Sequence, residues 1–170
     1  MGDVFKEQII KKVPTAQDSI KKTGITIIGV IIIAILGYFA IWDAFFRLIA
    51  VFLIFGVGFG IHYLTSQFNV EFEYIFTNGE LDIDVIYNKQ RRKHLLSVDA
   101  KNMEVFARAN DESRFASCAE TLDFSSGVPN ENTYAFATPH LGKKHKIIIE
   151  PNEKLLNAML PYLGQRKFLK

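Results

Sequence analysis

Two long stretches without a charged residue dominate the hydrophobic pattern at the start of the chain. The first runs from Thr23 to Trp42, and the second is most apolar from Leu48 to Leu64. At about 1.5 Å of rise per residue, a helix over 23–42 is about 30 Å long, which matches the hydrocarbon layer of a bilayer. The pattern predicts two transmembrane helices, 23–42 and 48–64, that form an antiparallel hairpin around a short external turn at 43–47.

A secretory signal and a buried helical hairpin of a soluble protein both fit these stretches less well. A secretory signal has a shorter apolar core and a small-residue cleavage site, whereas here a second apolar stretch follows the first. A buried hairpin has a polar stripe on each helix, whereas Ile25 to Trp42 is apolar on every side. A membrane hairpin is therefore the preferred interpretation.

Glycines in both stretches predict where the helices pack. Gly56 and Gly60 lie four residues apart in the second stretch, and Gly29 and Gly37 lie in the first. Such small residues let two membrane helices approach closely. With Gly58 they also resemble a phosphate-binding loop, but no strand precedes them and no acidic ribose ligand is identifiable. We interpret them as transmembrane packing positions.

Lysine is concentrated before the first stretch. Only Arg47 lies in the turn, while the segment 1–22 contains five lysines: Lys6, Lys11, Lys12, Lys21 and Lys22. Because an excess of Lys and Arg marks the cytoplasmic side, we expect a two-pass protein of the cell membrane with both termini in the cytoplasm. The single Cys118 fits a reducing compartment and has no second cysteine with which to pair.

The segment 1–22 also carries a helical pattern. Apolar residues recur among its lysines at helical spacing: Phe5, Ile9, Ile10 and Val13. This spacing predicts a short amphipathic helix on the membrane surface that ends at Pro14. Thr15 is suited to cap the next helix, with Asp18 in its first turn, so that helix is expected to begin near Ala16.

The remaining residues, 68–170, predict one small cytoplasmic β domain. The ranges 70–77 and 80–87 alternate between apolar and polar residues on either side of Asn78-Gly79. This dipeptide suits a two-residue type I′ turn, because both positions require positive φ. In that register the facing pairs are Phe76 and Leu81, Tyr74 and Ile83, Phe72 and Val85, and Glu73 and Asp84.

The pattern beyond this hairpin completes the domain. Further strands are expected at 91–98, 103–108, 121–125, 133–138 and 146–150, while the polar range 110–120 is expected to be a loop with a helical turn. After a cap at Asn152, a helix ending near Gly164 has one apolar stripe: Leu155, Leu156, Met159, Leu160 and Leu163. These elements predict an α+β membrane protein in which about seven antiparallel strands form a strongly bent sheet or partly open barrel, capped by the C-terminal helix.

The order of these features resembles the bacterial pleckstrin-homology-like (PH-like) membrane proteins. The shared features are two apolar helices, the motif Tyr74-x-x-Thr77-Asn78-Gly79, a basic third strand and a terminal helix. The runs VEFEYIFTNGELDID at 70–84, RRK at 91–93 and LSVD at 96–99 further resemble a family of small two-helix membrane proteins of Gram-positive bacteria. The resemblance covers most of the chain. It implies a PH-like cytoplasmic domain and a membrane-tethered scaffold or binding module without established catalytic residues.

Four cations at the third strand form the main candidate site: Lys89, Arg91, Arg92 and Lys93. Beside a bilayer they would attract anionic lipid at about 1 kcal/mol per cation. A structural role is the favoured interpretation, because Glu73 faces Asp84 and a cation from the neighbouring strand would relieve that repulsion. From Phe68 onward basic and acidic residues are equal in number, so no nucleic-acid partner is expected.

The resemblance also bears on the ligand. PH domains that hold inositol phosphates use a long loop between their first two strands, and the sequence predicts only Asn78-Gly79 at that place. This departure from the PH pattern favours recognition of a protein over recognition of a lipid headgroup.

No catalytic site, metal site or cofactor is expected. The side chains of Cys118, His140 and His145 match no zinc-binding spacing. Acidic pairs such as Asp82 and Asp84 arise from simple alternation on an exposed sheet face.

We therefore expect a non-enzymatic module whose PH-like domain binds a protein partner or scaffolds a membrane complex, with a second copy of the chain as another candidate partner. The alternative is a module that binds or senses anionic lipid through its basic third strand. The edges of an open sheet are a further candidate surface, because an unpaired strand can accept a peptide strand.

Overall fold

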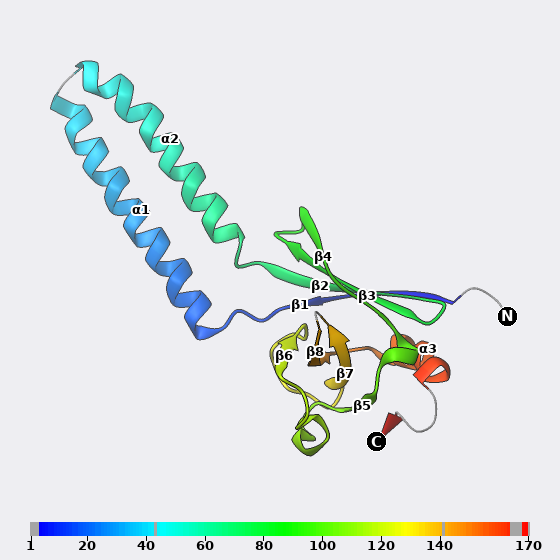
Figure 1. Ribbon diagram of the computed structural model, residues 1–170. Helices are drawn as coiled ribbons and strands as arrows, with labels where there is room; N and C mark the ends of the chain where they lie inside the picture. Colours follow the sequence, from blue (N-terminus) through cyan, green and yellow to red (C-terminus); the bar gives the residue numbers. More distant parts are fainter. Residues whose placement is uncertain (1–3, 43, 141, 164–167, 170) are drawn as a thin grey trace. The chain divides into compact units, whose positions relative to one another are not determined.

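The computed structural model describes residues 4–42, 44–140, 142–163 and 168–169. It contains two compact units. One is the chain from Pro14 to Asn69, a helical hairpin, and the other combines the chain up to Val13 with the chain from Val70 onward, a β domain (Figure 1).

The hairpin consists of α1 (Ala16–Trp42) and α2 (Ala44–Ser66), which are long and apolar enough to cross a membrane. The start of α1 is confirmed. The Asp18 N–H donates to Thr15 Oγ1 at 3.2 Å, and the Thr15 N–H donates to Asp18 Oδ2 at 3.1 Å. This reciprocal cap satisfies backbone donors that a helix start leaves without partners.

One of the four glycines expected at the α1–α2 contact lies in close contact there. A Cβ at Gly29 would lie 2.2 Å from Cδ1 of Ile61, so a larger residue at this position would force the Ile61 side chain to move. A Cβ at Gly37, Gly56 or Gly60 would meet no atom within 4 Å. These three positions have open space around them in the described hairpin, and a packing role for them stays a prediction.

The β domain contains two sheets (Figure 1). Sheet A is antiparallel and has the order β1-β2-β3-β4: β1 (Phe5–Lys11), β2 (Val70–Thr77), β3 (Glu80–Tyr87) and β4 (Arg91–Asp99). Sheet B has the order β6-β8-β7-β5-β9: β5 (Val105–Arg108), β6 (Glu120–Asp123), β7 (Tyr134–His140), β8 (Lys143–Ile149) and β9 (Phe168–Leu169). The seven strands expected from the sequence are present as β2 to β8, in an open arrangement.

The two sheets and the helix α3 (Glu153–Leu163) share one core. Its fully buried members include Phe76, Leu81, Phe106, Phe136, Ile147, Leu155 and Met159. Tyr74 ties the layers together through its hydroxyl, which donates to the Phe124 carbonyl at 2.6 Å and accepts from the Glu150 N–H at 3.3 Å. The cap of α3 is confirmed, because Asn152 Oδ1 accepts from the Leu155 N–H at 2.9 Å. The expected helix end at Gly164 lies outside the described residues.

The turn between β2 and β3 is also confirmed. Asn78 and Gly79 have φ of 49° and 104°, and the predicted facing pairs of β2 and β3 all occur. Gly79 has a second reason to be glycine, because a Cβ there would lie 2.7 Å from Cδ1 of Tyr162. The expected helical turn between Asn110 and Glu120 is the 3₁₀ helix η2 (Glu112–Phe115).

The predicted amphipathic helix over Phe5–Val13 is wrong, because this segment is the strand β1. It pairs along its whole length with β2, from Phe5 opposite Thr77 to Lys11 opposite Glu71. The apolar spacing of so short a segment does not distinguish a helix from a strand, and pairing with the open edge of β2 decides the outcome.

This strand also changes the place of the Asn78-Gly79 turn in the strand order. The turn joins the second and third strands, so the inference of a two-residue loop between the first two strands is wrong. The connection between β1 and β2 is the range 12–69, which contains both apolar helices.

The expectation that all strands are antiparallel is wrong for two pairs. β6 runs parallel to β8, and β5 runs parallel to β9. Residues 109–119 separate β5 from β6, which gives the chain enough length to reach the far edge of sheet B and enter it in the parallel sense.

Candidate functional site

The predicted basic residues lie at the end of sheet A from which both helical connections leave. β1 ends at Lys11 and β2 begins at Val70, and the Lys12 N–H donates to the Val70 carbonyl at 3.0 Å. The strand register continues from Val70 to Tyr87 and on to Arg91, so the β3–β4 turn lies at this same end. We define the basic end by six residues: Lys11, Lys12, Lys89, Arg91, Arg92 and Lys93.

Arg92 has the structural role that the sequence predicted. Glu73 and Asp84 face each other across β2 and β3. Arg92 Nη2 donates to Glu73 Oε1 at 2.8 Å, and its Nε lies 3.9 Å from Asp84 Oδ2. His94 Nδ1 lies 2.8 Å from the other Asp84 oxygen. The Arg92 side chain is still 54% exposed, so it shields the acidic pair while remaining at the surface.

Glu73 is the most buried charged group of this cluster, with a side chain 1% exposed. Its Oε2 lies 2.7 Å from Arg92 Nη2 without forming a hydrogen bond. Burial raises the pKa of the Glu73 carboxyl, Arg92 opposes that rise, and Glu7 and Asp84 add to it.

Lys89 occupies a strained position at the tip of the basic end. Asn88 and Lys89 have φ of 50° and 58°, and the Gln90 N–H donates to the Tyr87 carbonyl at 3.1 Å. Asn88 and Lys89 are the central residues of a β-turn within the three-residue loop 88–90, and the left-handed conformation costs a residue with a Cβ about 1–2 kcal/mol. The corresponding position of the β2–β3 turn holds Gly79. The chain therefore places an exposed cation where glycine is the more stable residue.

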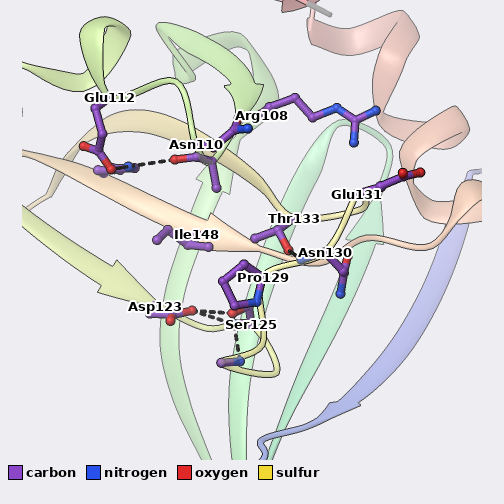
Figure 2. Close-up of a pocket in the computed structure, with 13 residues that line it drawn as sticks. Arg108, Asn110, Glu112, Asp123, Ser125, Pro129, Asn130, Glu131, Thr133 and Ile148 are labelled. Atoms are coloured by element: carbon purple, nitrogen blue, oxygen red, sulfur yellow. Dashed lines mark hydrogen bonds and ion pairs between the residues drawn. The ribbon is translucent and has the colours of Figure 1, made fainter.

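A second candidate site is a hollow of about 910 Å³ on the outer face of sheet B, the face turned away from sheet A. Figure 2 shows side chains from separate segments around it: Asp123 of β6, Ile148 of β8, the loop residues Pro129 and Thr133, and Arg108 and Glu112 on the far side. The sheet beside the hollow carries small side chains, because Ala107, Ala135 and Ala137 are buried on this face.

The two cations of the hollow already have partners within the domain. Lys146 has a side chain 5% exposed, and its Nζ lies 2.9 Å from Glu112 Oε1 and 3.0 Å from the Ala109 carbonyl. The same Nζ lies 5.0 Å from the centre of the Phe115 ring, and the Arg108 guanidinium lies 5.2 Å from the Tyr134 ring. Lys146 is therefore paired within the fold, whereas Arg108 has a ring contact and remains partly exposed.

The acidic groups of the hollow are more accessible. Asp123 is exposed, and its Oδ1 accepts from the Ser125 N–H at 2.9 Å and the Ser125 hydroxyl at 2.6 Å. Within the described part of the chain, no hydrogen bond or ion pair involves Asp123 Oδ2 or the exposed Glu131 carboxylate. The rim of the hollow therefore presents negative charge.

The sequence pattern did not predict this hollow. Its lining comes from three separate segments of the chain, within 108–112, 123–133 and 146–148, and no motif connects them. Two features of the sequence could have indicated it. One is the small side chains of Ala107, Ala135 and Ala137 on one face of β5 and β7, and the other is the charged Lys146 within β8.

The groups considered for chemistry are not brought together. Burial raises the pKa of the Cys118 thiol, which disfavours the reactive thiolate. Among the described residues, no group of three or more His, Cys, Asp or Glu side chains is arranged to hold a metal ion. The His140 side chain lies outside the described part.

The chain has two packed sheets that share a core with one helix, and its two apolar helices lie between the first two strands. This is the arrangement of a PH-like domain with a helical insertion. A family model described as bacterial PH-like domain (DUF6106) matches residues 2–169, and the chain belongs to this family. No curated protein and no solved structure matches the chain.

Proposed function

We propose that the protein is a two-pass, membrane-anchored binding module whose basic end contacts anionic lipid headgroups on the cytoplasmic side. α1 and α2 would cross the bilayer, as their length and composition allow. The lysines before α1 and within β1 favour the cytoplasmic side for the β domain. This role requires binding and no catalysis, in keeping with the PH-like family.

The observation that carries the proposal is the gathering of cations where the chain enters and leaves sheet A. Lys12 is followed after three residues by α1, and α2 ends four residues before Val70. With α1 and α2 in a bilayer, such short connections keep this end of sheet A close to the headgroups. Several carboxylates lie on the outer face of sheet A towards its other end: Glu7, Glu80, Asp82 and Asp99.

The strained position of Lys89 supports the same function. A lysine at positive φ reduces stability, and such a residue is retained where its side chain has a use. Near an anionic surface each cation contributes about 1 kcal/mol, and this attraction extends over about 8 Å at physiological ionic strength.

The test measures the distance of the β3–β4 turn from lipid headgroups. The full chain carries Gln90→Cys in a Cys118→Ser background, with a fluorophore on the new cysteine, and is placed in nanodiscs containing headgroup-quencher lipid. We expect stronger quenching in phosphatidylglycerol than in phosphatidylcholine, and a decrease with added salt or with Lys89→Gln and Lys93→Gln.

The matched control places the fluorophore at the other end of sheet A, through Thr77→Cys in the same background. We expect little quenching there in either lipid. Equal quenching of the Gln90→Cys label in both lipids, unaffected by salt, would overturn the lipid contact.

A second candidate function is recognition of a protein partner. The hollow on sheet B favours it, because its accessible charges are acidic and therefore unsuited to anionic lipid.

A further inference from the structure

We propose that the free edge of β6 and the adjoining hollow bind an extended, basic segment of a protein partner. The inference rests on the binding-module function proposed above and is independent of the lipid contact. The partner segment would add as a strand to sheet B and place a Lys or Arg side chain in the hollow.

The edge is the first requirement for such binding. β6 is the end strand of sheet B, and its described pairing is with β8 alone. Both ends of β6 are held to β8, because the Ala119 N–H donates to the Lys144 carbonyl at 2.8 Å and the Phe124 N–H donates to the Ile148 carbonyl at 3.0 Å. An anchored end strand presents backbone groups in a fixed position to which a peptide strand can bind.

The register brings this edge and the hollow together. In the pairing of β6 with β8, Asp123 lies opposite Ile148 and Thr121 lies opposite Lys146. Asp123, Ile148 and Lys146 line the hollow. In an added strand, alternate side chains point to the same face as Asp123, and the neighbouring strand lies about 4.8 Å away. A side chain of the bound segment therefore reaches the hollow without a change in the backbone.

The charges favour a basic segment. Lys146 is buried against Glu112, so its charge is already paired, and the partly exposed Arg108 lies over the Tyr134 ring. Asp123 Oδ2 and Glu131 remain accessible, while Ile148 and Pro129 give apolar surface for the stem of a long side chain. Lys and Arg combine an apolar stem with a charged head.

The experiment uses the full chain in phosphatidylcholine nanodiscs and a capped, fluorescein-labelled heptapeptide of alternating Val and Lys. Fluorescence anisotropy measures binding, with empty nanodiscs as the blank. We expect saturable binding and slower hydrogen exchange of the β6 amides. The same peptide with alternate backbone N-methyl groups should not bind, and the Val–Glu peptide should bind at least about tenfold more weakly.

Asp123→Asn with Glu131→Gln should weaken the Val–Lys peptide about fivefold or more, the range of one or two exposed charge pairs. Asn at 123 keeps the oxygen that accepts from Ser125, and a thermal melt checks the fold. Glu80→Gln on sheet A is the matched control and should leave binding unchanged. Equal binding of the Val–Glu or N-methyl peptide, or no binding, would overturn the proposal.

The lipid measurement separates the two ideas. If the peptide fails while quenching at Gln90→Cys depends on anionic lipid, the β6 site alone is wrong. If both measurements fail, the binding-module function is wrong.

Discussion

At the residue scale, Glu73 gives the domain a measurable dependence on pH. Its carboxyl pKa is raised above the ordinary value of 4.5, so the folded state favours the protonated form. The stability contributed by Glu73 is therefore fully present below about pH 4.5 and is lost as the pH rises through the folded-state pKa. The glutamine of the Glu73→Gln variant does not titrate. The melting temperature of this variant should therefore rise relative to that of the unsubstituted protein as the pH increases.

Glu120→Gln is the control of opposite sign. Lys143 and His145 lower the pKa of the Glu120 carboxyl, so its stabilisation is present at neutral pH and lost on acidification. Relative to the unsubstituted protein, this variant should become less stable as the pH rises. Two variants with the same pH dependence would contradict the assignment of Glu73.

The same cluster shows how far the sequence can be interpreted. The turn at Asn78-Gly79 fixes the register, the register places Glu73 opposite Asp84, and the repulsion between them predicts a cation from β4, which is Arg92. Each step needs only neighbouring strands. The hollow could not be predicted in this way, because Asp123, Lys146 and Pro129 meet only through the folding of distant segments.

At the element scale, the β3–β4 turn predicts a conflict between stability and lipid contact. Lys89→Gly removes a Cβ from a position with φ of 58° and should stabilise the domain by up to about 1 kcal/mol, even allowing for the flexibility of glycine in the unfolded chain. It should also reduce salt-dependent quenching of the Gln90→Cys label. Thermal melts and the quenching measurement check the two effects.

Asn88→Gly is the control for the turn. Asparagine already tolerates a φ of 50°, so this change should add little stability and leave lipid contact unaltered. If Lys89→Gly stabilises no more than Asn88→Gly, the strain assigned to Lys89 is wrong.

β1 is the element that local pattern could not identify, and it predicts what a minimal domain requires. The range 68–170 lacks β1. This fragment would therefore have an exposed edge at β2 and would lose the contacts that Ile10 makes with the core. We expect that fragment to aggregate. A chain in which a short Gly-Ser linker replaces residues 14–69 should fold as a soluble monomer, since Lys12 and Val70 are hydrogen-bonded neighbours.

Size-exclusion chromatography and circular dichroism compare the fragment and the linked chain directly. A monomeric 68–170 fragment that melts at the same temperature as the linked chain would show that β1 is dispensable. The parallel entry of β6 was missed for a related reason, because strand direction depends on long-range pairing that alternation of side chains does not encode.

At the scale of the whole molecule, the two apolar helices are an insertion within the PH-like domain. The helices are inserted between β1 and β2, so a single sheet receives the chain on both sides of the hairpin. If both helices cross the membrane, as proposed above, the basic end and the hollow belong to the same side of it.

The sidedness of the chain in the membrane is the most direct test of this arrangement. Ala44→Cys and Gln90→Cys are introduced separately in a Cys118→Ser background, and intact cells are treated with a membrane-impermeant maleimide. We expect labelling of the Ala44→Cys variant in intact cells and of the Gln90→Cys variant only after lysis. Labelling of the Gln90→Cys variant in intact cells would contradict a cytoplasmic PH-like domain and, with it, the proposed contact with the inner membrane surface.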